Sequence, residues 1–563
     1  SEEKVSSKEI KDFLKKVLPN YMIPSHIMQL ESMPSNANGK IDRKALPILD
    51  LLQSEVKFIK PRNELEQKLV SIWCKIFNIK KISVKDNFFD LGGSSLTAIN
   101  LVSKIHKELK IKIIVTDVFS KPSIEELAEY LNSMKIDEEL VNEIEKVEEK
   151  EYYEASAVQK RIYAINQTNV NSINYNIPIA YLIKGEFNKE SLEKAISKLM
   201  DRHESLRTSF HVFEENIFQK VHSKVKFKVE YIKINDRFDK NKVKVDEFIK
   251  PFDLSKAPLI HVNVIEFKDA SVLLIDIHHI VSDGVSMSVI IKELSSLYNG
   301  EALTSLKIQY KDFSNWQNRL YKNGLLDSEE KYWLNKFKGE IPRLNIPSDY
   351  KDIKTESFEG NTVNFEINKI LIQKINKTIA SLGITKFMFY VAVYNVLLYK
   401  YTNQEDLIIG TPTAGRTHED LKGIVGMFVN TLPLRNKIEK NMNFRDFLKE
   451  VKENSLKDFE NQNYDLKNLF EKLDIKKMPL FNVIFSFQNI NTENLKFNNA
   501  KVSSYKLKSN VSKFPITMIL NEENEKISGE LEYQTSLYKK DTIENFAKHY
   551  INLNYSYKNK NHA

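Results

Sequence analysis

The segment with the clearest capacity for acid–base chemistry is the adjacent pair His278 and His279, which precedes Asp283 and Gly284. A neutral imidazole accepts a proton near pH 7, so either histidine is a candidate general base. The preceding run, SVLLIDI, indicates a strand, in which neighbouring side chains point to opposite faces. Only one histidine can then face a given cleft, which argues against a metal site built from both. We expect Gly284 to permit a tight turn and Asp283 to be held by a cation, although an isolated His–Asp pair is more often structural than catalytic.

A second candidate is the serine pair Ser94 and Ser95, which follows Gly92 and Gly93. The glycines permit a backbone path that larger residues cannot take, and exposure at a loop–helix junction suits a modification site. A serine at a helix N-terminus also lies where the backbone N–H groups and the macrodipole favour an attached phosphate. An isolated GGSS run is most often an ordinary helix N-cap, so the surrounding pattern decides between the two interpretations.

The composition argues against several other kinds of site. Hydrophobic residues make up 42% of the sequence, which is typical of a globular protein. The length of 563 residues indicates several domains. The net charge of +8 is small for this length and the charges are interspersed, so binding to nucleic acid or to a membrane surface is not indicated. A single cysteine, Cys74, excludes an internal disulfide and a CxxC metal site. No apolar run reaches the roughly 18 residues of a membrane span and no signal peptide is evident, so we expect a cytoplasmic protein.

The elements that would position the serine form a compact helical segment at 60–134. Asn63 and Glu66 have capping-box spacing, a second helix is predicted from Ser95, and Ser123 is expected to cap a third. Four short helices in this length predict a small bundle. The charged residues 135–151 that follow predict a tether with a little helical character.

The elements that would position the histidines lie in 152–556, where strand and helix patterns alternate. The runs IPIAYLIKGEF, SVLLIDIHH and DLIIGTP predict strands, and Asn188 precedes a predicted helix. A mixed pattern of this length predicts an α/β fold of two lobes, at about 152–325 and 326–556.

The helical segment resembles the peptidyl carrier protein family, whose motif it matches with DNFFDLGGSSL from Asp86 to Leu96. The resemblance implies that Ser95 carries a 4′-phosphopantetheine arm, attached from coenzyme A by a phosphopantetheinyl transferase. Ser94 stands where relatives usually have His or Asp, and the register favours Ser95. Such an arm lets one tethered acyl group visit several sites at high effective concentration.

The larger segment resembles the condensation domains of nonribosomal peptide synthetases, which share the fold of chloramphenicol acetyltransferase. The histidine loop matches their H-H-x-x-x-D-G signature. Other stretches match further motifs of the family in the expected order along the chain, at Ser156–Tyr163, Arg202–Phe210, Tyr310–Trp316, Gly410–Arg435 and from Met478. The resemblance implies a passage between two lobes, where an acceptor amine attacks a donor thioester. It implies that His279 faces this passage as base or as hydrogen-bonding positioner, that His278 is structural, and that Asp283 pairs with an arginine, for which Arg416 is the candidate.

Residues 1–48 resemble the end of an adenylation domain, including its N-G-K-I-D-R motif with Lys40. In that family the lysine contacts the substrate carboxylate and the adenylate phosphate. The bulk of such a domain is absent from this sequence, so we expect Lys40 to be idle and the chain to be a fragment.

The resemblance therefore predicts antibiotic or secondary-metabolite synthesis, in which the carrier at Ser95 supplies an L-configured donor. Its expected partners are the phosphopantetheinyl transferase, an upstream adenylation domain and a downstream acceptor carrier. An epimerase or a dual epimerisation–condensation domain shares the histidine motif, and a catalytically silent carrier and docking fragment is a further alternative. The motifs from Arg202 and Tyr310 favour condensation over epimerisation.

Overall fold

The computed structural model describes residues 58–134, 143–350, 358–473, 480–488, 494–507, 510–523 and 526–556. The chain divides into two units, 1–59 and 60–563, and the fold below is that of the second. The adenylation-like segment 1–48, with Lys40, lies outside the described residues.

The carrier segment is the predicted helical bundle. Its helices are α2 (Glu64–Phe77), α3 (Ser95–Leu109), α4 (Val115–Ser120) and α5 (Ile124–Asn132). The side chains of Asn63, Ser94 and Ser123 cap α2, α3 and α5. The buried rings of Trp73 and Phe88 meet edge to face at 5.6 Å in the core.

The described part of the connection after the carrier, residues 143–151, is not the partly helical tether that the charge pattern predicted. Its described residues, from 143, have no helix, and Ile144 is buried in a cluster with Trp316. The backbone N–H of Val147 donates to Asp312 Oδ1 at 2.9 Å. Burial of an apolar side chain and this bond fix the segment against α10 (Tyr310–Lys322), so it belongs to the folded body.

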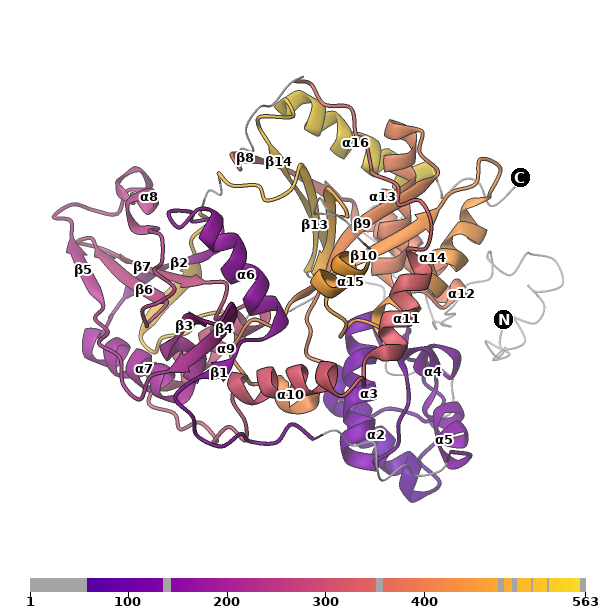
Figure 1. Cartoon of the computed structure of the whole chain (residues 1–563), viewed down its shortest axis with the longest axis horizontal. Helices are drawn as coiled ribbons and strands as arrows, with labels where there is room; N and C mark the ends of the chain where they lie inside the picture. Colours follow the sequence, from indigo (N-terminus) through magenta and orange to yellow (C-terminus); the bar gives the residue numbers. More distant parts are fainter. Residues whose placement is uncertain are drawn as a thin grey trace, which may run out of the picture. The chain divides into compact units, whose positions relative to one another are not determined.

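The first lobe is built on a five-stranded sheet of order β12-β2-β7-β6-β5 with a three-stranded sheet, β1-β4-β3, beside it (Figure 1). The strands of the larger sheet are β2 (Asn176–Gly185), β5 (Glu230–Lys233), β6 (Ile260–Glu266), β7 (Ser271–His278) and β12 (Ala500–Ser504). Those of the smaller sheet are β1 (Tyr153–Glu154), β3 (Thr208–Phe213) and β4 (Asn216–Val221). The helices are α6 (Ala157–Thr168), α7 (Lys189–Arg202), α8 (Val245–Phe248) and α9 (Gly284–Tyr298), with 3₁₀ turns at Glu204–Arg207 and Lys240–Lys242.

The second lobe is built on a six-stranded mixed sheet of order β10-β9-β11-β13-β14-β8. The strands are β8 (Gly360–Ile367), β9 (Asp406–Thr413), β10 (Asn430–Lys437), β11 (Val483–Gln488), β13 (Ile516–Glu523) and β14 (Lys526–Gln534). The helices are α11 (Asp327–Lys336), α12 (Lys369–Leu382), α13 (Lys386–Thr402), α14 (Phe444–Glu460), α15 (Leu466–Lys472) and α16 (Lys540–Ser556), with a 3₁₀ turn, η5, at Glu419–Leu421. Most of α13 is buried, as its apolar sequence requires.

The predicted division of the lobes near residue 325 is too simple, because later segments return to the first lobe. Strand β12 pairs antiparallel with β2, and Leu495 and Phe497 enter the first lobe's core. Val425 and Met427 enter the same core from the loop before β10. These two crossings tie the lobes together and bring distant parts of the sequence to the histidine loop.

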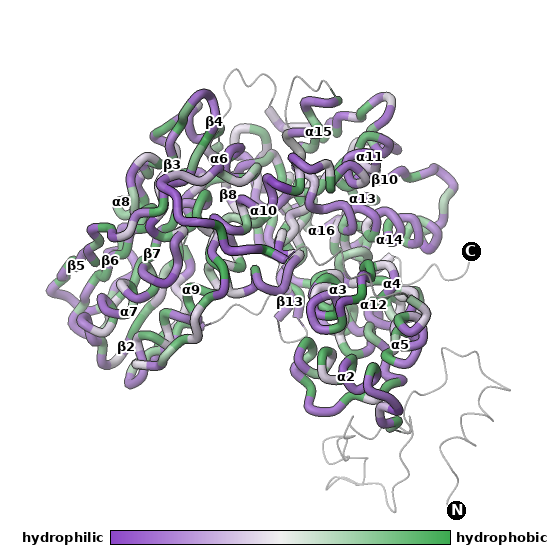
Figure 2. The backbone as a smooth tube through the Cα atoms, turned by 60° about the horizontal axis from the view of Figure 1, so that its bottom comes forward, coloured by the Kyte–Doolittle hydropathy of each residue, from purple (hydrophilic) through white to green (hydrophobic). Residues whose placement is uncertain are grey.

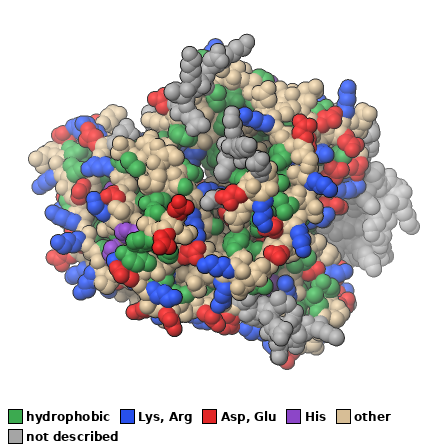
Figure 3. All heavy atoms as spheres, in the orientation of Figure 1, with side chains coloured by type: hydrophobic (Ala, Val, Ile, Leu, Met, Phe, Trp, Pro, Cys, Tyr) green, Lys and Arg blue, Asp and Glu red, His purple; other side chains and the backbone are tan. Residues whose placement is uncertain are grey.

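One face of the molecule agrees with the even charge pattern of the sequence (Figure 3). On the face drawn in Figure 3, basic and acidic side chains are interspersed rather than segregated. Green and purple segments alternate at short intervals along the tube in Figure 2, as amphipathic helices and strands require. Within the described ranges no single helix has the length and apolar character of a membrane span; only the bent pair Lys369–Leu382 and Lys386–Thr402 passes by length and composition.

Candidate active site

His279 lies just beyond the end of β7 and is held by two hydrogen bonds to backbone. Its N–H donates to the carbonyl of Tyr175 at 2.7 Å, and its ring Nδ1 lies 2.9 Å from the carbonyl of Ser282. A carbonyl oxygen can only accept, so Nδ1 carries the proton and Nε2 is the basic nitrogen. The side chain is partly exposed and lines a cavity, so His279 is the histidine that is open to a passage.

His278 points elsewhere, as strand alternation predicted. Its side chain is 1% exposed, and its Nδ1 accepts the backbone N–H of Ile280 at 3.1 Å. Burial lowers the pKa of His278 to about 3, with smaller effects from the charges of His279 and Lys513. A neutral, enclosed imidazole of this kind can support the loop but cannot meet a substrate.

Lys513 adds a positive charge beside His279. Its Nζ lies 4.4 Å from the ring centroid of Tyr175, whose ring centroid lies 6.3 Å from that of His279. Desolvation lowers the pKa of Lys513 to about 8, although part of the side chain is exposed. Burial, followed by the charge of Lys513, lowers the pKa of His279 to about 4, whereas Asp283 acts in the opposite direction. The imidazole is therefore neutral at pH 7.

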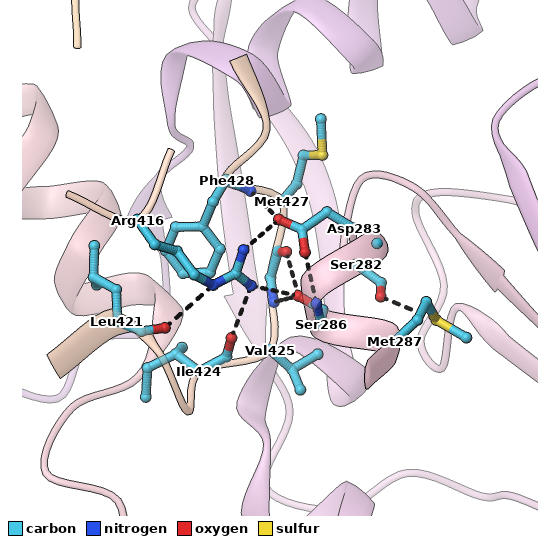
Figure 4. A network of polar contacts seen from close by, with 12 residues as sticks. Ser282, Asp283, Ser286, Met287, Arg416, Leu421, Ile424, Val425, Met427 and Phe428 are labelled. Atoms are coloured by element: carbon cyan, nitrogen blue, oxygen red, sulfur yellow. Dashed lines mark hydrogen bonds and ion pairs between the residues drawn. The ribbon is translucent and has the colours of Figure 1, made fainter. Parts of the chain in front are cut away.

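Asp283 and Arg416 form a buried ion pair between the lobes (Figure 4). Arg416 Nη1 donates to Asp283 Oδ2 at 2.8 Å, and the same carboxylate accepts N–H groups from Ser286 and Phe428. Arg416 also donates to Ser286 Oγ at 2.8 Å, and its guanidinium lies 4.1 Å from the ring centroid of Phe428. Burial acts to raise the pKa of Asp283, but Arg416 and the N–H donors hold it below its ordinary value. Arg416, the candidate partner suggested by the sequence, is therefore in contact with Asp283. The buried pair stabilises the histidine loop and does not face the passage.

The expected role of Gly284 as a tight-turn residue is wrong. Its φ is outside the left-handed region, and an added Cβ would meet no atom within 4 Å. It is the first residue of α9 and lines the cavity beside His279, so the absence of a side chain keeps space open there.

One cavity of about 760 Å³ reaches from the carrier serine to the histidine loop. Ser95 and Gly92 line it from the carrier, His279 and Gly284 from the first lobe, and Lys386 from the second. Ser95 lies at the start of α3, where Ser94 is the N-cap, and is 8% exposed. Its Oγ lies 3.4 Å from Thr385 Oγ1 of the second lobe. The two candidate residues, 184 positions apart in sequence, therefore share one space.

Three residues of this site could not be predicted from the sequence. Tyr175, Thr385 and Lys513 belong to none of the motifs described above, and each reaches the site through tertiary packing. The run SKFP around Lys513 offers no recognisable signal in isolation.

The fold and the site define a two-lobed acyltransferase of the chloramphenicol acetyltransferase type, joined to a carrier bundle. Family models agree: the condensation domain model matches residues 149–554 and the phosphopantetheine attachment site model matches 67–131. The chain belongs to the condensation domain family of nonribosomal peptide synthetases and contains a phosphopantetheine carrier domain.

Known synthetases are similar to almost the whole chain. Bacitracin synthase 3 of Bacillus licheniformis is 43% identical over 97% of this chain and 9% of its own length. Gramicidin S synthase 2 of Brevibacillus brevis is 40% identical over 98% of the chain and 12% of its own length. The chain thus spans about a tenth of these relatives.

Solved structures agree with the fold. The condensation domain of Monacolin K polyketide synthase MokA has a TM-score of 0.65 at 20% identity, over 74% of this chain and 99% of that one. The four-domain nonribosomal peptide synthetase AB3403 has a TM-score of 0.67 at 20% identity, over 75% and 34%. At this identity the likeness supports the two-lobed fold alone.

The residues around Ser95 fit a phosphopantetheine arm. Gly92 has φ +90°, and a Cβ on Gly93 would lie 2.3 Å from the ring of Phe88, so both positions require glycine. This tight loop presents Ser95 at a helix N-terminus, which favours an attached phosphate. The adjoining cavity offers space for an extended group on the side that leads to His279.

Proposed function

We propose that this chain carries an aminoacyl or peptidyl donor on Ser95 and joins it, at His279, to the amine of an acceptor held on a second carrier. The observation that carries the proposal is the single cavity lined by both residues. The arm, when attached, supplies a thiol that holds the donor as a thioester. Holding both reactants at one site replaces a bimolecular encounter by an oriented one, which is worth about 7–11 kcal/mol at best.

His279 is proposed to accept the proton that the acceptor nitrogen loses. The acceptor nitrogen bonds to the donor carbonyl carbon, the carbon–sulfur bond breaks, and the thiolate leaves and regains a proton. Nε2 is the free nitrogen, and the bond from Nδ1 to the Ser282 carbonyl fixes the ring. The lowered pKa keeps the base unprotonated at neutral pH, at the cost of a weaker proton affinity.

The partners and the finer domain assignments belong to the same proposal. We infer that a phosphopantetheinyl transferase modifies Ser95, that an upstream adenylation domain loads it, that the acceptor carrier is downstream, and that the donor is L-configured. Residues 1–48 are proposed to be the end of that adenylation domain, which is supported by the N-G-K motif with Lys40 and by relatives that align over 97–98% of the chain. A cytoplasmic location is also proposed, on the support of the single cysteine.

Mass spectrometry of the intact chain after treatment with coenzyme A and the transferase tests the carrier assignment. We expect one added arm on the peptide that contains Ser95, the same addition in Ser94→Ala, and none in Ser95→Ala. Two arms on the wild-type chain, or an arm retained in Ser95→Ala, would contradict it. Transfer of the loaded donor to a carrier-bound amine then tests condensation.

A further inference from the structure

The carrier contacts the second lobe through a small charged interface. Lys104 and Lys107 of α3 bind Glu419 and Asp420 of η5, with Nζ–oxygen distances of 3.0 and 2.5 Å. We call these four side chains the latch. All four are partly buried, from 17% to 38% exposed, so their attraction is screened less than that of exposed charges. Lys422 also contacts Glu419 and therefore competes with Lys104 for its charge.

A second contact lies on α4 and supports the same docked position. The backbone N–H of Thr116 donates to Glu460 Oε1 at 3.0 Å, and the Thr116 hydroxyl donates to the same oxygen. Glu460 is the last residue of α14, so both contacts lie on the second lobe.

In this docked position the carrier serine is hidden. Ser95 is 8% exposed, and its Oγ lies 3.4 Å from Thr385 Oγ1. A transferase must bring coenzyme A to this oxygen. The oxygen then bonds to the phosphorus next to pantetheine, the pyrophosphate bond to the adenosine-bearing phosphate breaks, and the hydroxyl proton passes to a base. With Ser95 packed against Thr385 of the second lobe and only 8% exposed, little of the residue is open to a separate enzyme in this position.

We propose that the latch sets a balance between two exclusive states of the carrier: a docked state that delivers the donor to His279, and a released state in which Ser95 is modified. Only the role of the docked state in delivering the donor to His279 rests on the proposed function. Weakening the latch therefore changes the two rates in opposite directions, because the rate of each step scales with the population of its competent state.

The test reverses the charge on the condensation side alone, so that the carrier surface seen by the transferase is unchanged. In Glu419→Lys/Asp420→Lys, we expect phosphopantetheinylation of Ser95 to become faster and single-turnover transfer from the fully modified, loaded chain to become slower. Each rate should change by about threefold, because the product of the two changes equals a shift of about tenfold in the docking equilibrium. Adding Lys104→Glu/Lys107→Glu restores the opposite charges and should return transfer toward the wild-type rate. Glu190→Lys/Glu301→Lys is the matched control, because it makes the same charge change at exposed positions of the first lobe.

The opposite signs separate the latch from a simple folding defect. A defect would slow transfer without making modification faster, so two rates that fall together, or a modification rate equal to that of the control, would overturn the proposal. If the wild-type chain formed no amide at all, the proposed function would fail, whereas the modification rates would still report on the latch. Comparable melting temperatures of the double variant and the control complete the measurement.

Discussion

The buried pair between Asp283 and Arg416 should contribute strongly to the stability of the junction between the lobes. The side chains are 0% and 4% exposed, so replacing Arg416 by Met leaves a carboxylate that water cannot solvate. Removing one partner of a buried pair costs about 3–5 kcal/mol. The carbonyls of Leu421 and Ile424 would also lose a donor, which places the cost toward the upper end of that range.

Urea denaturation of Arg416→Met and Asp283→Asn, followed by circular dichroism and tryptophan fluorescence, measures this cost. The loss in free energy of unfolding in the double variant should be about 2–3 kcal/mol smaller than the sum of the losses in the two single variants, because the double variant leaves no unpaired charge. The control is Lys194→Met, which breaks the exposed pair of Lys194 and Glu190 and should cost less than about 0.5 kcal/mol. A loss in Arg416→Met no larger than that of the control, or full additivity, would refute the reasoning.

Three further predictions concern pH and packing. The pKa of His278 in the folded state is about 3, below the ordinary 6.5, so the folded state resists protonation and the stability falls as the pH drops through 6.5. Between pH 7 and pH 5 the free energy of unfolding of the wild type, measured by urea denaturation, should therefore fall by about 2 kcal/mol more than that of His278→Asn. Replacing Lys513 by Met removes a charge that lowers the pKa of His279, so the acid limb of the pH profile of the transfer rate should move to higher pH. Lys513→Arg keeps the charge and should leave that limb in place. Identical pH profiles for Lys513→Met and the wild type would contradict this effect. Gly426→Ala should lower the melting temperature, because its Cβ would lie 1.9 Å from the Tyr310 ring, whereas Gly284→Ala, with open space, should not.

The sequence predicted the local parts of this site well, for physical reasons. Strand alternation separated the faces of His278 and His279, and the run of two glycines placed Ser95 at a helix start. Both patterns depend on a few neighbouring residues, whose spacing alone sets the geometry. The two-lobed α/β fold also followed from the alternation of strands and helices.

The parts that escaped prediction depend on contacts between distant segments. Strand β12 crosses to the first lobe, and Lys513 then reaches Tyr175 from 338 positions away in sequence. Lys107 and Asp420 are 313 positions apart, and their pairing requires the docked carrier. Ile144 lies in a run of charges that indicates a solvated tether, yet a tertiary core buries it. No local pattern encodes these neighbours.

The most direct test of the account is single-turnover transfer from the loaded arm on Ser95 to a carrier-bound amine in His279→Ala and His279→Asn. Loss of a positioned proton acceptor should slow amide formation by about 10²–10⁴-fold in both variants, while modification and loading of Ser95 stay at the wild-type level. Amide formation at the wild-type rate in His279→Ala would contradict the central claim.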